Sequence, residues 1–171
     1  QTEANVRKIR NVWVRESTIK DVSRKFPFAS RVLCHGTRNA SEQRYFKKYL
    51  PNAEILGTEI SHTADQFPMT VQHDFHETKA DWVGEFDIVY SNSFDHSYDP
   101  TKCLTAWKDQ LSLIGNLFVE LMTREDNMSK RSDPLEIREK EFIELAESLG
   151  LILIESFMVE TKNSKVFRFK K

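Results

Sequence analysis

Apolar residues along most of the chain fall into short runs, and each run ends at a polar or flexible residue. These runs predict β-strands at residues 31–34, 54–58, 69–73, 86–91 and 116–121. With their polar carboxyl ends they form the segments 31–37, 54–59, 71–74, 86–92 and 117–120. In an open parallel sheet such ends lie along one edge, where ligands bind. The sequence therefore predicts a binding site at this edge.

Helical spacing of apolar residues predicts four helices, at residues 6–26, from about Ala40 to Pro51, at 100–112, and from Pro134 to Leu149. Asp133 can cap the last helix, and Pro134 suits its first turn. Glu136 completes a capping box, and Gly150 offers the left-handed conformation that ends a helix. Alternating strands and helices indicate a parallel sheet with right-handed crossovers.

The carboxyl-terminal residues break this alternation. Two strand-like runs, 151–159 and 165–169, are joined by residues 160–164, which leave no room for a helix. We expect the two runs to pair as an antiparallel hairpin at the end of the sheet. A sheet finished in this way differs from the dinucleotide-binding fold, which has six parallel strands.

The length of 171 residues indicates one domain with a substantial core. Its 25 basic and 26 acidic side chains nearly cancel, which disfavours nucleic acid as a partner. Residues 1–25 carry seven Lys or Arg against three acids. We interpret this excess as the solvated face of a helix.

Cys34 and Cys103 are the only cysteines, and their spacing fits neither a disulfide framework nor a zinc site. A reducing compartment, and so a cytoplasmic location, is expected. No apolar stretch approaches the roughly 20 residues that span a bilayer, so no membrane association is predicted.

The loop at residues 35–40 has the features of a ligand-binding turn. It follows the first buried strand and opens a helix, whose first turn offers free N–H groups. Gly36 lets the backbone approach a ligand closely. The loop does not match the G-x-G-x-x-G pattern, so a plain strand-to-helix turn remains the alternative.

Two acidic residues end the next two strands. Glu59 stands 23 residues after Gly36, where an acid can accept hydrogen bonds from both hydroxyls of a ribose. The alternative is that Glu59 caps the following turn. Asp74 is placed to accept from an adenine amino group, beside the apolar wall of Phe75.

This pattern resembles the class I S-adenosylmethionine-dependent methyltransferases, particularly those that act on small molecules. The resemblance covers roughly residues 30–171, with 31–40 similar to the family's first motif, 86–93 to its fourth-strand motif and 113–120 to its fifth strand. It implies an α/β fold, a Rossmann-like three-layer sandwich whose seven-stranded, mostly parallel sheet ends in an antiparallel hairpin. Residues 29–171 would form the S-adenosylmethionine-binding domain, and residues 1–28 a helical cap or lid.

The resemblance also implies a set of cofactor contacts. Gly36 and its neighbours would contact the methionine part, Glu59 the ribose, and Asp74 with Phe75 the adenine. The full set is His35, Gly36, Thr37, Arg38, Asn39, Glu59, Ile60, Asp74, Phe75, Ser91, Asn92 and Ser93. S-adenosylhomocysteine would be the product.

Two departures from the family's first motif concern the amino-acid end of the cofactor. The family usually carries an acid where Cys34 stands, and further glycines where Arg38 and Ala40 stand. We therefore expect substitute contacts from His35, Arg38 or Asn39.

The segment 91–100, after the fourth strand, is the densest group of candidate catalytic residues. Similar small-molecule methyltransferases often have an acid and a histidine here, as Asp95 and His96 stand in this chain. Histidine titrates near neutrality, so His96 can remove a proton from a substrate hydroxyl or amine. The alternative is that His96 packs over the adenine or bonds to the backbone. The segment lacks the Asn-Pro-Pro-Tyr motif of amino-methyltransferases that act on adenine and glutamine.

The sequence favours an enzyme that transfers a methyl group from S-adenosylmethionine to a small-molecule acceptor. A methyltransferase acting on nucleic acid or protein, and a non-catalytic module that binds S-adenosylmethionine, remain alternatives. The hairpin and the missing glycine fingerprint disfavour a nicotinamide-dependent oxidoreductase. The segment 73–77 lacks the H-E-x-x-H order, so no metal site is predicted. The acceptor, the methylated atom and the oligomeric state do not follow from the sequence.

Overall fold

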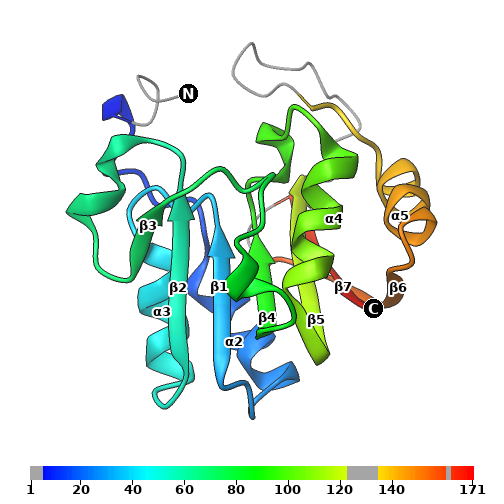
Figure 1. Ribbon diagram of the computed structural model, residues 1–171, viewed down its shortest axis with the longest axis horizontal. Coiled ribbons are helices and arrows are strands. Elements are labelled where there is room, and N and C mark those ends of the chain that lie inside the picture. Colours follow the sequence, from blue (N-terminus) through cyan, green and yellow to red (C-terminus); the bar gives the residue numbers. More distant parts are fainter. Residues whose placement is uncertain (1–5, 123–134, 161–162) are drawn as a thin grey trace.

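A computed structural model describes residues 6–122, 135–160 and 163–171 and contains one seven-stranded sheet (Figure 1). Its strands are β1 (Arg31–His35), β2 (Glu54–Glu59), β3 (Thr70–Gln72), β4 (Phe86–Ser91), β5 (Leu111–Met122), β6 (Ile152–Met158) and β7 (Ser164–Lys170). The strand order is β3-β2-β1-β4-β5-β7-β6. The first five strands pair in parallel, and β7 pairs antiparallel with both β5 and β6. The predicted sheet and hairpin are confirmed.

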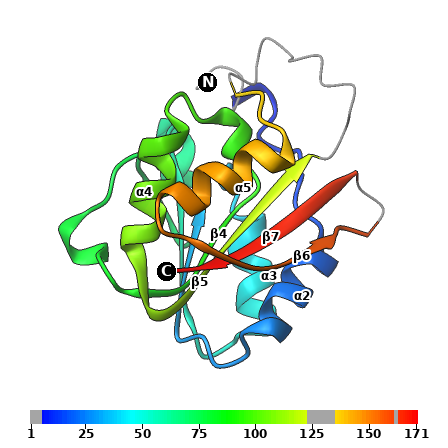
Figure 2. The ribbon, with the colours of Figure 1, turned by 90° about the vertical axis from the view of Figure 1, so that its right-hand side faces the viewer.

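Helices cover both faces of the sheet (Figure 2). They are α2 (Glu16–Lys25), α3 (Ser41–Tyr49), α4 (Pro100–Gln110) and α5 (Glu139–Ser148). On one face Ile19 of α2 and Phe46 of α3 join a buried cluster with Val32. On the other face Trp107 of α4 and Phe142 of α5 join a cluster around neighbouring strand residues. The predicted three-layer sandwich is therefore confirmed.

Strand β1 shows why its sequence is an uninterrupted apolar run. Successive side chains of a strand point to opposite faces, and both faces of this sheet are covered. Val32 and Cys34 therefore pack against the layer of α2 and α3, whereas Leu33 packs against the layer of α4 and α5.

The chain order of the sheet reverses at β1. This strand pairs with β2 on one side and with β4 on the other, so that His35 lies opposite Thr58 and Ser91 in the two registers. Loops that leave the sheet at such a reversal diverge and open a crevice at the carboxyl ends of the strands. The segment before α2 runs along the same edge (Figure 1).

Helices α3 and α4 lie close to their predicted positions. Pro100 stands in the first turn of α4, and the Asp99 carboxylate accepts a hydrogen bond of 2.9 Å from the Lys102 N–H. This helix ends at Gln110 because the chain enters β5 at the next residue. Strand β5 therefore starts five residues before the predicted strand, and its pairing with β4 is irregular there.

The predicted single helix over residues 6–26 is wrong. Residues 11–15 are not helical, and α2 begins only at Glu16. The amide of Asn39 donates to the backbone carbonyls of Ile9 and Asn11, at 2.9 and 3.0 Å. These bonds hold an irregular segment whose carbonyls a continuous helix would have used itself.

The predicted start of the last helix is also wrong. Asp133 and Pro134 lie outside the described residues, and α5 begins at Glu139. The cap is made by Glu141, whose carboxylate accepts from the Arg138 N–H at 3.0 Å. Apolar Leu135 and Ile137 pack against the core in non-helical backbone, which keeps the helix from starting earlier. At the other end Gly150 has a φ of 81°, which confirms its predicted role.

Strand and helix do not alternate throughout. Between β2 and β4 the chain forms only the short 3-10 helices η1 (His62–Gln66) and η2 (Ala80–Trp82). This stretch has no long apolar stripe at helical spacing. Across the described ranges, no helix is long and apolar enough to cross a membrane.

Candidate functional site

The loops that follow β1 and β4 are packed directly against each other. Gly36 has a φ of +72°, and a Cβ placed on it would lie 2.7 Å from the Cβ of Ser93. The Ser93 hydroxyl donates to the Gly36 carbonyl at 3.1 Å. Glycine is therefore required here both for its backbone conformation and for the close approach of Ser93.

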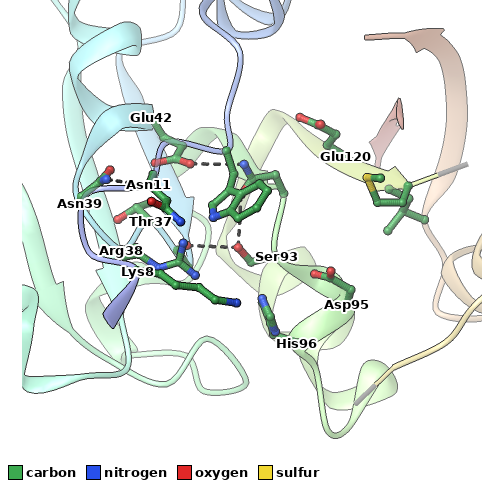
Figure 3. Close-up of a pocket in the computed structure, with 15 residues that line it drawn as sticks. Lys8, Asn11, Thr37, Arg38, Asn39, Glu42, Ser93, Asp95, His96 and Glu120 are labelled. Atoms are coloured by element: carbon green, nitrogen blue, oxygen red, sulfur yellow. Dashed lines mark hydrogen bonds between the residues drawn. The ribbon is translucent and has the colours of Figure 1, made fainter. Parts of the chain in front are cut away.

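A pocket of about 250 Å³ opens beside this contact (Figure 3). It is lined by Lys8, Asn11 and Trp13, by Gly36, Thr37, Arg38, Asn39 and Glu42, by Asn92, Ser93, Asp95 and His96, and by Glu120, Leu121 and Met122. Four segments that are distant in sequence therefore meet at the carboxyl edge of the sheet, where the sequence predicted a site.

Eight of the predicted site residues line this pocket, namely Gly36, Thr37, Arg38, Asn39, Asn92, Ser93, Asp95 and His96. Asp95 and His96 lie on the 3-10 helix η3 (Phe94–His96), which follows β4 directly. The backbone carbonyl of Asp95 accepts from the Leu135 N–H at 3.1 Å, which ties this helix to the segment before α5. The pocket thus joins the predicted methionine-binding loop to the predicted catalytic pair.

The side chain of His35 belongs to the core instead of the pocket. It is buried, stacks on Trp107 with ring centroids 5.2 Å apart, and has a hydrogen bond at each ring nitrogen. These bonds join Nδ1 to the Thr58 hydroxyl at 2.9 Å and Nε2 to the side-chain amide oxygen of Gln110 at 2.8 Å. Burial lowers the pKa of His35 to about 3, although the bond to Gln110 acts in the opposite direction. The imidazole is therefore neutral at physiological pH.

Glu59 lies beyond the pocket lining, at the end of β2. Its side chain is buried, with Oε2 accepting from the Arg38 N–H at 3.1 Å and Oε1 from the Ser61 N–H at 2.9 Å. The carboxylate therefore connects the loop after β1 to the turn after β2. The bond from Ser61 is the turn cap that the sequence offered as the alternative. The predicted ribose contact would use the same carboxylate.

Asp74 also lies outside the lining, in the loop after β3. Its Oδ1 accepts from the backbone N–H and the ring Nδ1 of His76, and its Oδ2 accepts from the Tyr98 hydroxyl at 3.0 Å. Burial acts to raise the pKa of Asp74, but these hydrogen bonds outweigh it and leave the pKa lowered. The carboxylate is therefore ionised.

The remaining predicted residues, Ile60, Phe75 and Ser91, do not line the pocket either. Phe75 packs edge-on against Trp107, and the backbone carbonyl of Ile60 accepts from the Gln72 amide at 3.1 Å. The Ser91 hydroxyl donates to the His35 carbonyl at 3.1 Å, which stabilises the junction of β1 and β4.

Glu42 is a pocket residue that the sequence analysis missed. It lies in the first turn of α3 and is only 5% exposed. Its Oε1 accepts from the Asn92 amide at 3.4 Å, whereas Oε2 has no hydrogen-bond partner among the residues that the structure describes. Burial raises the pKa of Glu42 to about 7. An acid one helical turn before buried Phe46, on the same helix face, was the available signal.

Glu120 is a second buried acid of the lining to which the sequence analysis gave no role. Its Oε2 accepts from the Tyr90 hydroxyl at 2.9 Å, and its Oε1 accepts from the Ser164 hydroxyl at 2.7 Å. Its place at the polar end of β5 was visible in the sequence. The partner Ser164 comes from the hairpin, which local sequence patterns do not bring to this position.

The segment before α2 supplies three lining residues, which the sequence analysis placed in a helical cap or lid without giving them a role in the site. Figure 3 shows Lys8 and Asn11 on the same side of the pocket as Arg38 and Asn39. Asn39 holds this segment by the two amide bonds described above and accepts from the Ser41 hydroxyl at 2.7 Å. A loop residue thus fixes one wall of the pocket.

A search of the described ranges finds no group of three or more His, Cys, Asp or Glu residues that could hold a metal ion. The charged residues of the lining are Lys8, Arg38, Glu42, Asp95 and Glu120. The pocket therefore combines both signs of charge in a small volume.

No protein-family model matches the sequence, and no curated protein matches it by sequence. Solved structures do match. The 1,6-didemethyltoxoflavin-N1-methyltransferase of Burkholderia thailandensis, with bound 1,6-didemethyltoxoflavin and S-adenosylhomocysteine, has a TM-score of 0.80 at 15% identity, over 99% of this chain and 86% of that chain. A TehB-like SAM-dependent methyltransferase from Corynebacterium glutamicum has a TM-score of 0.72 at 18% identity, over 99% and 97% of the two chains.

The mitomycin 7-O-methyltransferase MmcR matches with a TM-score of 0.73 at 14% identity. The match covers 91% of this chain and 53% of the MmcR chain. The first two matches span 99% of this chain and so include the sheet, the hairpin and both helical layers. The chain therefore has the fold of the class I S-adenosylmethionine-dependent methyltransferases.

Proposed function

We propose that the protein transfers a methyl group from S-adenosylmethionine to a nucleophilic atom of a small molecule. One observation supports this most directly. The pocket at the topological switch point places the loop of Gly36 to Asn39 opposite Asp95 and His96 (Figure 3). One cavity is therefore lined by a loop that can bind a cofactor and by two side chains that can accept or donate a proton.

Two features of the site fit this cofactor. The missing side chain of Gly36 lets Ser93 pack against this loop, so that both loops reach the pocket proposed for the cofactor. Oε2 of Glu42 has no partner among the described residues and gives the pocket a buried acceptor, to which the ammonium group of the cofactor can donate. The cofactor supplies an electrophilic methyl group on a sulfonium sulfur.

Glu59, Asp74 and Phe75 are proposed to hold the nucleoside. Each carboxylate already accepts hydrogen bonds, so the ribose and adenine would share these oxygens with the present donors or replace some of them. Tyr98 is the donor most easily replaced because its side chain is 62% exposed. Its movement would open one oxygen of Asp74 to an adenine amino group.

The chain's main contribution to the reaction is alignment. Holding the nucleophile, the methyl carbon and the sulfur in line can lower a barrier by as much as ~7–11 kcal/mol. His96 is proposed to take the proton from an acceptor hydroxyl or amine, with Asp95 beside it on η3. Two methyltransferases with this fold are named for small-molecule acceptors, which supports a small acceptor here.

Residues 1–28 are proposed to act as a cap on the domain formed by residues 29–171. Lys8 and Trp13 support this because they line the pocket from outside the sheet.

The net charge of −1 argues against nucleic acid as the acceptor. We also propose a cytoplasmic location. The two buried cysteines support it because they are not joined in a disulfide, as is usual in a reducing compartment.

Replacement of Glu59 by Ala tests the assigned nucleoside site. We expect at least a tenfold weaker affinity for S-adenosylhomocysteine, about 1.4 kcal/mol, because both carboxylate oxygens are lost at the end of β2. Isothermal titration calorimetry measures this. Glu54→Ala is the matched control, since it removes an exposed acid at the opposite end of the same strand. Equal affinities of the two variants would remove Glu59 from the site.

His96→Ala tests the catalytic role. Turnover should fall at least tenfold, with unchanged affinity for S-adenosylhomocysteine, because His96 is proposed to act on the acceptor's proton. The measurements are methyl transfer with an identified acceptor and calorimetry with the product cofactor. A parallel loss of turnover and affinity would make His96 a binding residue instead.

A further inference from the structure

Glu42 is a buried acid whose hydrogen bonding is incomplete among the described residues. Its side chain is 95% buried and lines the pocket, yet Oε2 accepts no hydrogen bond from the described residues. Its other oxygen, Oε1, accepts from the Asn92 amide at 3.4 Å. Leaving a buried acceptor unsatisfied is costly, so a donor from a ligand would gain from meeting this oxygen.

The groups that face Glu42 come from several elements. Arg38 of the preceding loop favours its charged form, whereas Glu120 of β5 opposes it. Burial raises the pKa of the Cys34 thiol on β1, and the charge of Glu42 raises it further. Cys34 packs in the cluster that contains Phe46 of α3, so Glu42 of the same helix lies on the face of the sheet that Cys34 points to.

The same pocket carries cations on an adjoining wall. Lys8 and Arg38 lie on the side of the pocket where Glu42 lies (Figure 3). A buried acid next to two cations is complementary to an α-amino acid group, which has an ammonium and a carboxylate on one carbon. S-adenosylmethionine carries such a group at one end.

We propose that Glu42 binds the α-ammonium group of S-adenosylmethionine, while Lys8 and Arg38 face its carboxylate. This assignment rests on the proposed function and deepens it, because it identifies the residue that orients the amino-acid end. It also explains how the first motif functions with Cys34 in place of an acid. The negative charge would be supplied instead from the first turn of α3, on the face of the sheet that Cys34 points to.

Glu120 is the other buried acid of the lining, and it is less suited to this role. Its two oxygens already accept from Tyr90 and Ser164. An incoming ammonium group would gain less there, since both oxygens are already satisfied. Glu120 therefore serves as the matched control for Glu42.

The first test compares S-adenosylhomocysteine with its desamino analogue, in which hydrogen replaces the ammonium group. Calorimetry on the wild-type chain should show at least a tenfold preference for S-adenosylhomocysteine. In Glu42→Gln this preference should fall to less than threefold, through weaker binding of S-adenosylhomocysteine alone. Glu120→Gln should keep the wild-type preference.

Each outcome has a definite meaning. If Glu120→Gln loses the preference and Glu42→Gln keeps it, the ammonium site belongs to Glu120 and the proposal is overturned. If both variants keep it, Glu42 serves another group, such as an amine of the acceptor. If the wild-type chain binds neither ligand, the proposed function itself fails, which is a different result from a misassigned residue.

A second readout does not depend on the analogue. Binding of an ammonium group favours the ionised form of Glu42, so the wild-type chain should release up to about one proton per ligand at pH 6. Titrations of S-adenosylhomocysteine in two buffers of different ionisation enthalpy measure this number. Glu42→Gln should release at least half a proton less than the wild-type chain. Equal release from both proteins would overturn the assignment.

Discussion

Replacement of Gly36 by Ala is expected to abolish most of the affinity for S-adenosylhomocysteine, by at least a hundredfold or about 2.7 kcal/mol. The new Cβ would lie 2.7 Å from the Cβ of Ser93 and 2.8 Å from its Oγ, distances that force one of the two loops to move. Because both loops line the pocket, either movement displaces groups proposed to contact the cofactor. Calorimetry measures the affinity, and urea denaturation measures the accompanying loss of stability.

Gly84 provides a matched control for the backbone contribution. Its φ of +75° is close to that of Gly36, but a Cβ at residue 84 would have no neighbour within 4 Å. Gly84→Ala should therefore cost only the left-handed strain, about 1–2 kcal/mol of stability, and leave the affinity unchanged. Gly36→Ala should lose an additional ~1–3 kcal/mol of stability through overpacking.

A compensating change separates the clash from other effects. Ser93→Gly removes the Cβ and Oγ that the new side chain would meet, and the next nearest atom, on Phe75, lies at an ordinary 3.7 Å. The double variant should therefore regain at least tenfold in affinity over Gly36→Ala. If the double variant binds no better, the close packing of the two loops is not what the site requires.

The strands were predictable because their signal is local. Apolar runs with polar carboxyl ends gave five parallel strands and the hairpin, and a sheet covered on both faces makes such runs continuous. Helix boundaries were less predictable where a distant residue decides them. The amide of Asn39 bonds to two carbonyls of the N-terminal segment and interrupts a helix that apolar spacing alone would continue.

The residues of the candidate site also differ in how far the sequence predicts them. Positions set by the ends of adjacent strands, such as Gly36 and Ser93, follow from the strand order once the fold is known. The environment of Glu42 does not, because it is set by Asn92, which follows β4, and by Glu120 of β5. A histidine in the first motif looked like a ligand contact, but Trp107 and Gln110 of α4 draw its side chain into the core.

Stability should depend on pH through two buried groups that act in opposite directions. Burial lowers the pKa of His35 to about 3, below the ordinary value of 6.5. As pH falls below about 6.5, His35 takes up a proton in the unfolded chain but stays neutral in the folded chain. The free energy of unfolding therefore decreases as pH falls from about 6.5 toward 3. Burial raises the pKa of Glu42 from 4.5 to about 7. The contribution of its protonated form is lost as pH rises from about 4.5 to 7.

Between about pH 4.5 and 6.5 the two contributions nearly cancel in the wild-type chain, since each changes by about 1.4 kcal/mol per pH unit. Single variants should expose them. Relative to the wild-type chain, the free energy of unfolding of His35→Gln should rise by roughly 3 kcal/mol as pH falls through this window. That of Glu42→Gln should rise by roughly 3 kcal/mol as pH rises through it. Urea denaturation at each pH gives these differences. The double variant should run parallel to the wild-type chain, because neither group titrates in it. Curves of both single variants that run parallel to the wild type would mean that neither pKa is shifted by folding.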